Sequence, residues 1–211
     1  MSDLRSREFS YPSYRVRRPN LLGGALCLDF INTVEWRGAP VHGDRLVSYD
    51  ELLIWAESAG TIDRKSASGL AARARARPDR ATAALAAAIE LRETIAALFS
   101  ASAPRAPLLE RLNDWLARAP ERKRIAASAG SYAWAASDAA GDLAAPLWPV
   151  AWSAADLLIS GRAARVRACT DKSCGWMFLD TSRSRRRRWC SMEGCGNRAK
   201  ARRHYRKRRA A

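Results

Sequence analysis

Two matched cysteine pairs near the C-terminal end constrain this chain more than any other feature. Four residues separate Cys169 from Cys174, four separate Cys190 from Cys195, and 15 residues lie between the pairs. Zinc prefers four ligands at the corners of a tetrahedron, and two local pairs joined by a loop provide them with little loss of chain entropy. The spacing therefore predicts one structural Zn(Cys)4 site with Cys169, Cys174, Cys190 and Cys195 as its ligands.

The alternative is a pair of disulfides or four unligated thiols, and the expected compartment argues against it. Residues 1–20 are polar, basic and contain prolines, which is unlike a signal peptide, and no stretch of 18 apolar residues could span a bilayer. We therefore expect a cytoplasmic protein, associated with the nucleoid when bound, and no membrane partner. Paired cysteines in that reducing compartment favour metal ligation.

The charge of the chain is concentrated at the same end. Residues 162–211 contain 17 Lys and Arg against three acidic residues, a net of +14 out of the total of +16, which leaves only +2 for residues 1–161. A helix this basic repels itself in water, so its partner should be polyanionic. We expect nucleic acid, with double-stranded DNA favoured. The candidate contact residues are Arg183, Arg185, Arg186, Arg187, Arg188, Arg198, Lys200, Arg202, Arg203, Arg206 and Lys207.

Two less specific interpretations of the basic tail remain, a solvated charge run and a membrane-surface helix. The second needs a large apolar face, which the tail lacks. If about six of the basic residues bound phosphates, affinity would fall roughly a thousandfold between about 50 and 200 mM salt.

The region around the cysteines is too small to fold by hydrophobic burial alone. About forty residues cannot build an adequate core, so metal binding should supply the folding energy and chelation should unfold this end only. Between the pairs, WMFLD and RRRRW resemble the two strands of a hairpin, with Phe178 and Trp189 as apolar packing residues. Asn197 could cap the helix that follows.

Upstream, the apolar spacing predicts a helical domain. Leu26, Phe30 and Val34 indicate a short helix that ends at Gly38 and Pro40, and Ser48 or Asp50 can cap the next one. Further helices are expected over 64–77, 79–101, 108–116 and 146–160. Ile125, with Tyr132 and Trp134 across 129–131, suggests a short β-hairpin.

The chain is thus expected to be mainly α. Residues 1–20 would form a basic arm that could be partly disordered, and 21–161 a helical domain with a small β-hairpin. Residues 162–211 would form a treble-clef-like Zn(Cys)4 module that ends in a basic helix.

The string Cys195-Gly196-Asn197-Arg198, together with the first cysteine pair and the Phe178, Asp180 and Ser182-Arg183 that follow it, resembles the CGNR zinc-finger family. LCLDFINT and SAADLL (153–158) look like the ABATE domain that commonly precedes this finger. The resemblance implies a bacterial, stress-induced transcription regulator whose finger binds DNA, and it implies the same four cysteine ligands.

A transcription regulator responds to a signal, and we expect the helical domain to bind the effector that carries it. Asp29, Asn32, Trp36 and Arg37 combine charge, amide and aromatic surface as a small-molecule effector pocket would. The alternative is that Asp29 and Arg37 pair with or cap neighbouring groups. Trp148 and Trp152 could belong to the core or to a homodimer interface.

Three functional classes follow from these patterns. The first is a DNA-binding transcription regulator whose helical domain senses a ligand or dimerises. The second is an RNA-binding zinc-knuckle factor, or a partner-binding protein whose zinc is only structural. The third is an enzyme, which we do not expect, because the chain has two histidines, no nucleophile motif and no phosphate-binding glycine loop.

Overall fold

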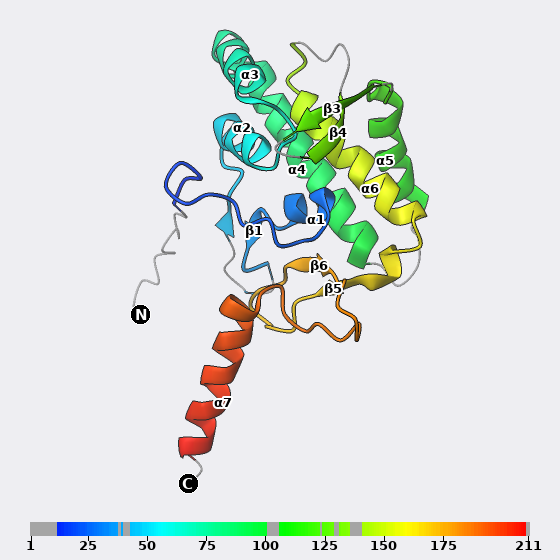
Figure 1. Ribbon diagram of the computed structural model, residues 1–211. Coiled ribbons are helices and arrows are strands. Elements are labelled where there is room, and N and C mark those ends of the chain that lie inside the picture. The colour runs from blue at the N-terminus through cyan, green and yellow to red at the C-terminus, as the bar shows by residue number, and fades with distance from the viewer. Residues whose placement is uncertain are drawn as a thin grey trace.

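A short buried helix, α1 (Leu26–Ile31), lies at the centre of the fold, which we describe from a computed structural model (Figure 1). The described residues are 12–37, 39, 43–100, 106–122, 124–128, 131–135 and 141–209. Cys27, Leu28, Phe30 and Ile31 are each 0% exposed. A helix of six residues is not stable in isolation, so burial against its neighbours must stabilise α1.

The helices predicted around it are present. They are α2 (Tyr49–Ser58), α3 (Arg64–Ala76), α4 (Pro78–Ser100), α5 (Ala106–Arg118) and α6 (Trp148–Ile159), the last preceded by a 3-10 turn, Ala145–Leu147. Ser48 caps α2 as predicted, because its hydroxyl accepts a hydrogen bond from the Glu51 amide at 3.2 Å. Gly60, with a φ of 72°, ends α2.

Within the described residues, three two-stranded antiparallel ladders accompany the helices. β1 (Val34–Glu35) pairs with β2 (Gly43–Asp44), and β3 (Arg124–Ser128) pairs with β4 (Ser131–Ala135). The second ladder confirms the predicted hairpin, with Ile125 opposite Trp134, while residues 129–130 of its turn lie outside the described residues. β5 (Val166–Ala168), which follows a 3-10 turn (Ala163–Arg165), pairs with β6 (Met177–Leu179).

The first predicted helix ends earlier than expected. The helix stops at Ile31, with Asn32 as its C-terminal cap, and Val34 pairs with Asp44 in a strand instead of continuing the apolar face. The reason is local, since the Thr33 hydroxyl donates to the Phe30 carbonyl at 2.8 Å and turns the chain there. Gly38 and Pro40, the predicted end of this helix, lie outside the described residues.

The core is continuous from the helical part into the C-terminal part. Trp148 and Trp152 are buried in it, and the ring centroids of Trp148 and Trp115 lie 5.4 Å apart. Met177 and Leu179 of β6 belong to the same core. The two tryptophans of α6 are therefore core residues, and the C-terminal module rests directly on the helical part through β6.

Candidate metal centre and basic surface

The four predicted ligands come together from two local structures. Cys169 directly follows β5 and Cys174 lies in the turn before β6, where the Cys169 amide donates to the Trp176 carbonyl at 2.8 Å. Cys190 follows a loop, and Cys195 lies in a single π-helical turn, Met192–Gly196, that leads into α7 (Asn197–Arg209). A hairpin turn with one pair and a helix start with the other is a treble-clef-like arrangement, as predicted.

The distances fit one zinc ion. The four Sγ atoms all lie within 4.8 Å of one another, with 3.7 Å between those of Cys174 and Cys190 and 3.6 Å between those of Cys190 and Cys195. A tetrahedron with Zn–S bonds of about 2.3 Å has edges of about 3.8 Å, whereas a disulfide bond is about 2.05 Å long. None of the five cysteines is in a disulfide. When bound, zinc would cross-link the hairpin to the helix start.

A small apolar cluster encloses the sulfurs. Phe178 is 0% exposed and packs with the four cysteines, and half-buried Trp176 and Trp189 cover them from outside. The predicted packing role of Phe178 and Trp189 is confirmed. The Trp176 indole also donates to the Val34 carbonyl at 3.0 Å, which ties this cluster to the helical part.

The predicted hairpin between WMFLD and RRRRW is wrong. β6 pairs with β5, on the other side of the first cysteine pair, and 180–189 form a loop. The buried carboxylate of Asp180 organises this loop by accepting hydrogen bonds from the Ser182 amide at 2.9 Å, the Ser182 hydroxyl at 2.6 Å and the Arg187 amide at 3.0 Å. Because this carboxylate binds the Arg187 amide, that amide cannot take part in a ladder along the arginine run.

The cap of the C-terminal helix also differs from the prediction. Asn197 already has helical backbone angles, and Ser191 provides the cap by accepting a hydrogen bond from the Gly194 amide at 3.2 Å. The π-helical turn therefore brings Cys195 into the metal site and continues without a break into α7. Figure 1 shows α7 extending away from the rest of the molecule.

The predicted basic residues fall into two groups, and the first group has internal partners. Arg187 stacks over the Phe178 ring at 4.3 Å and donates to the carbonyls of Trp189 and Cys190. Arg198 and Arg202 are ion-paired with Asp171, at 3.2 and 3.1 Å. These three arginines stabilise the module itself.

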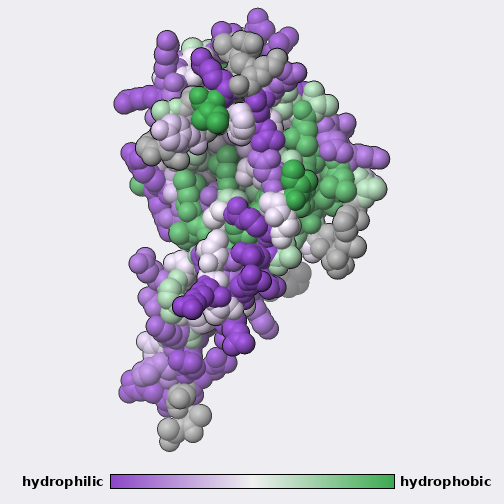
Figure 2. All heavy atoms as spheres, turned by 45° about the vertical axis from the view of Figure 1, so that its right-hand side comes forward, coloured by the Kyte–Doolittle hydropathy of each residue, from purple (hydrophilic) through white to green (hydrophobic). Residues whose placement is uncertain are grey.

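The second group points into solvent. Hydrophilic residues dominate the lower, C-terminal end of the molecule in Figure 2. Arg188 is exposed and lies 5.2 Å from the Trp189 ring. The Lys207 side chain lies outside the described residues. The remaining predicted contact residues are exposed and have no ion-pair partner within the described part of the chain: Arg183, Arg185, Arg186, Lys200, Arg203 and Arg206.

Asp171 is the functional residue that sequence reasoning missed. It lies between the cysteines of the first pair, its side chain is 2% exposed, and it pairs with two arginines of α7. A buried carboxylate needs such partners, because burial of an unpaired charge is costly. In the sequence, Asp171 is recognisable as an acidic residue between two cysteine ligands in a strongly basic segment.

Arg198 contacts both cysteine pairs' surroundings and the helical part. Besides Asp171, its Nη2 donates to the Cys195 Sγ at 2.8 Å, and its Cζ lies 4.8 Å from the Trp36 ring centroid. Thiolate ligands commonly receive hydrogen bonds that partly neutralise the charge of a metal centre. Arg198 thus connects the metal site, the first knuckle and the helical part.

The four residues predicted for an effector pocket do not surround one cavity. Asp29 accepts a hydrogen bond from the Gly23 amide at 2.7 Å, and Asn32 binds the backbone of Met177. Asp29 and Asn32 line a cavity of only about 10 Å³, which is room for about one water molecule. Trp36 instead lines a groove of about 700 Å³ between the helical part and the metal site.

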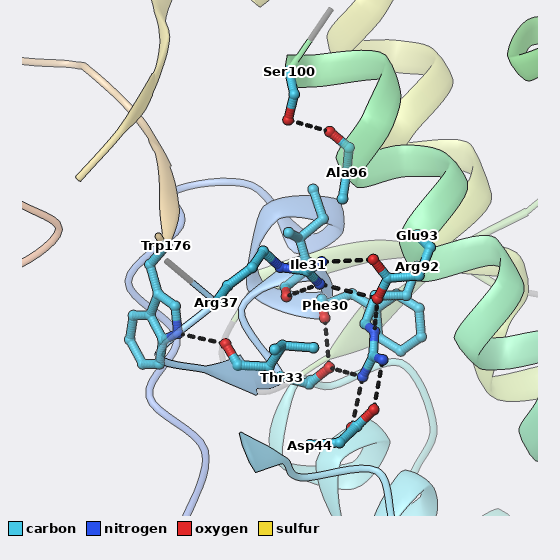
Figure 3. A network of polar contacts seen from close by, with 11 residues as sticks. Phe30, Ile31, Thr33, Arg37, Asp44, Arg92, Glu93, Ala96, Ser100 and Trp176 are labelled. Atoms are coloured by element: carbon cyan, nitrogen blue, oxygen red, sulfur yellow. Dashed lines mark hydrogen bonds and ion pairs between the residues drawn. The ribbon is translucent and has the colours of Figure 1, made fainter. Parts of the chain in front are cut away.

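Arg37 belongs to a polar network that joins β2 and the residues after β1 to α4 (Figure 3). Its Nη2 donates to Glu93 at 3.1 Å, and the neighbouring Arg92, only 2% exposed, forms a two-pronged ion pair with Asp44 at 2.7 and 2.6 Å. Arg92 also donates to the Thr33 hydroxyl at 3.2 Å. Asp29 and Arg37 are therefore paired internally, in line with the alternative weighed from the sequence.

These two parts define a class of protein in which a helical domain carries a cysteine-ligated metal module with a basic helix. A family model described as "ABATE: Putative stress-induced transcription regulator" matches residues 24–161, and a model of the CGNR zinc finger matches residues 165–208. Because the first match covers more than half of the chain, the protein belongs to the ABATE family, with a CGNR zinc finger after the ABATE domain. No curated protein matches the chain in a sequence comparison. None of the described helices has the length and hydropathy that a membrane span requires.

Proposed function

We propose that this protein is a zinc-dependent DNA-binding transcription regulator and that α7 and the loop 180–189 form its DNA-binding surface. The observation that carries the proposal is the group of exposed, unpaired Arg and Lys side chains on these two segments, which a metal site holds together. Phosphates of a nucleic-acid backbone are the polyanion that such a surface binds. None of the described side chains of α7 is buried, and the helix extends from the body, so these side chains are accessible.

Duplex DNA is the proposed form because three of the free basic residues, Lys200, Arg203 and Arg206, lie on a regular helix. The 13 residues of α7 span about 20 Å, and a helix fits into the major groove of B-DNA, which is about 12 Å wide. Single-stranded nucleic acid is usually bound on aromatic platforms. Tyr205, which is 67% exposed, and the His204 ring packed beside it are the aromatic groups of α7.

The proposal is tested by measuring the affinity of the intact protein for labelled duplex DNA across a salt series. We expect the logarithm of affinity to fall linearly with the logarithm of salt concentration, by about 0.9 for each phosphate bound. A Cys195→Ser variant, which loses one metal ligand, should lose binding together with zinc. Stronger competition by RNA of the same sequence at about 150 mM salt would instead favour the RNA-binding alternative.

The helical domain is proposed as the sensing or dimerising part. The groove beside Trp36, Trp176 and Arg198 is the place to look for a small-molecule effector, because it lies next to the start of α7. Its volume of about 700 Å³ is within the usual range for ligand sites. Sedimentation of the protein with and without DNA would determine whether it acts as a homodimer.

A further inference from the structure

The two sides of α7 differ in how their charges are compensated. Arg198 and Arg202 are four residues apart, so they lie on the same side of the helix, and both guanidinium groups contact the carboxylate of Asp171. A Zn(Cys)4 centre has a formal charge of minus two, and Asp171 adds one more negative charge. The two guanidiniums on this side therefore face an excess of negative charge and add little to the positive field of the surface.

The opposite side has no such compensation. At about 100° per residue, Lys200 points about 180° away and Arg203 about 120° away from the mean direction of Arg198 and Arg202. Lys200 and Arg203 are exposed and have no ion-pair partner in the described ranges. Their charges are free to bind an external anion.

Arg198 is also held from the helical domain. The Trp36 indole lies under its guanidinium at 4.8 Å, and Trp36 has a left-handed backbone with a φ of 58°. Residues other than glycine rarely adopt that conformation, so the surrounding structure must hold Trp36 in place. Contacts from three directions thus fix the first turn of α7: the carboxylate of Asp171, the sulfur of Cys195 and the ring of Trp36.

We propose that α7 presents the side of Lys200 and Arg203 to the phosphates of a DNA duplex, while Arg198 and Arg202 act as positioning residues that hold the helix on the metal module. This inference rests on the proposed DNA-binding function and specifies which half of the helix performs it. Two adjacent arginines, Arg202 and Arg203, have opposite roles. One is paired with a buried carboxylate, and the other is free to bind a phosphate.

This adjacency allows a matched test with Arg202→Gln and Arg203→Gln in the zinc-loaded full chain. Both variants remove one positive charge from the same turn of α7. For R203Q we expect the salt slope of duplex binding to decrease by about 0.9 and affinity at about 150 mM salt to fall about fivefold, because one phosphate contact is lost. For R202Q we expect an unchanged salt slope.

A second measurement reports the positioning role without DNA. R202Q removes an ion pair with the buried carboxylate of Asp171 in the metal knuckle, so zinc release to a chromophoric chelator should become about tenfold faster. R203Q should leave the release rate unchanged. Arg203→Lys, which keeps the charge, should restore the salt slope.

The outcomes separate this inference from the function on which it rests. If wild-type protein shows no salt-dependent binding to the duplex, the proposed function fails and this inference fails with it. If wild-type protein binds but R202Q and R203Q reduce the slope equally, the function stands and the assignment of the two sides is wrong. A preference of wild-type protein for single strands would overturn the duplex as partner.

Discussion

The side-chain amide of Asn32 makes hydrogen bonds to both backbone polar groups of Met177: Nδ2 donates to the carbonyl and Oδ1 accepts from the amide, each at 2.9 Å. Asn32 follows α1 and Met177 begins β6, so this pair joins the helical part to the zinc module. The Leu179 amide adds a bond to the Gly23 carbonyl at 2.7 Å. Side chain and backbone thus provide β6 with partners on its otherwise open edge.

Replacing Asn32 with alanine should strongly destabilise the protein. The change leaves a buried amide and a buried carbonyl of Met177 without partners, and each such loss costs about 1–3 kcal/mol. We expect a decrease of about 2–6 kcal/mol in the free energy of unfolding, measured by urea denaturation. Asn20→Ala, at an exposed position, is the matched control and should change stability by less than about 0.5 kcal/mol. Equal effects of the two changes would contradict the role given to Asn32.

Zinc removal should affect the helical domain as well as the finger. The sequence alone suggests that chelation unfolds only the C-terminal end, but Met177 and Leu179 belong to the main core. Exposing two such side chains costs about 3–6 kcal/mol. Hydrogen exchange should therefore become faster in α1, which packs on β6, as well as in the finger after chelation. Unchanged exchange in α1 would mean that the two parts are independent.

The sequence was informative where local rules decide the structure. The cysteine spacing predicts the metal site, and Ser48 predicts the start of α2, because ligand geometry and helix caps act within a few residues. The predictions are wrong where the local structure depends on a hydrogen-bond partner that the local sequence pattern does not indicate. Asp180 binds the Arg187 amide, which a strand at RRRRW would have used, and Ser191 caps the helix because a π-helical turn precedes Asn197. The pairing of Asp171 with Arg198 and Arg202 depends on the metal fold itself and has no local pattern.

Asp29 should make stability decrease as pH rises through the mildly acidic range. Burial raises the pKa of this carboxyl to about 6, although the hydrogen bond from Gly23 lowers it in part. A folded pKa above the unfolded value of about 3.9 means that the native state binds the proton more tightly, so stability is lost between about pH 4 and 6 and is constant above that. Asp29→Asn should remove this dependence. Thermal unfolding at pH 4.5 and 7.5 should show the variant gaining stability relative to wild type only at the higher pH.

Arg92 should be the charged residue of the helical domain whose loss is most damaging. Arg92 is 2% exposed, pairs with Asp44, donates to Thr33 and contacts Glu93, so Arg92→Leu leaves Asp44 without its ion-pair partner. Removing one member of a fully buried ion pair costs about 3–5 kcal/mol, which is an upper bound here because the Asp44 side chain is 34% exposed. Arg122→Leu is the matched control, because Arg122 also forms a two-pronged pair, with Asp156, but on the surface, where such pairs contribute about 0–1 kcal/mol.

The same network gives an acid dependence of the opposite sign to that of Asp29. Burial alone would raise the pKa of Asp44, but the hydrogen bond and charge of Arg92 lower it below its ordinary value, and Arg37 and Arg92 likewise lower the pKa of Glu93 against the effect of burial. A lowered folded pKa contributes stability that is present above the unfolded pKa of about 4 and is lost as pH falls through the folded pKa. Wild-type protein should therefore lose stability below about pH 4, and R92L should lose less over that range. A parallel pH dependence of wild type and R92L, measured by urea denaturation between pH 2.5 and 5, would contradict this assignment.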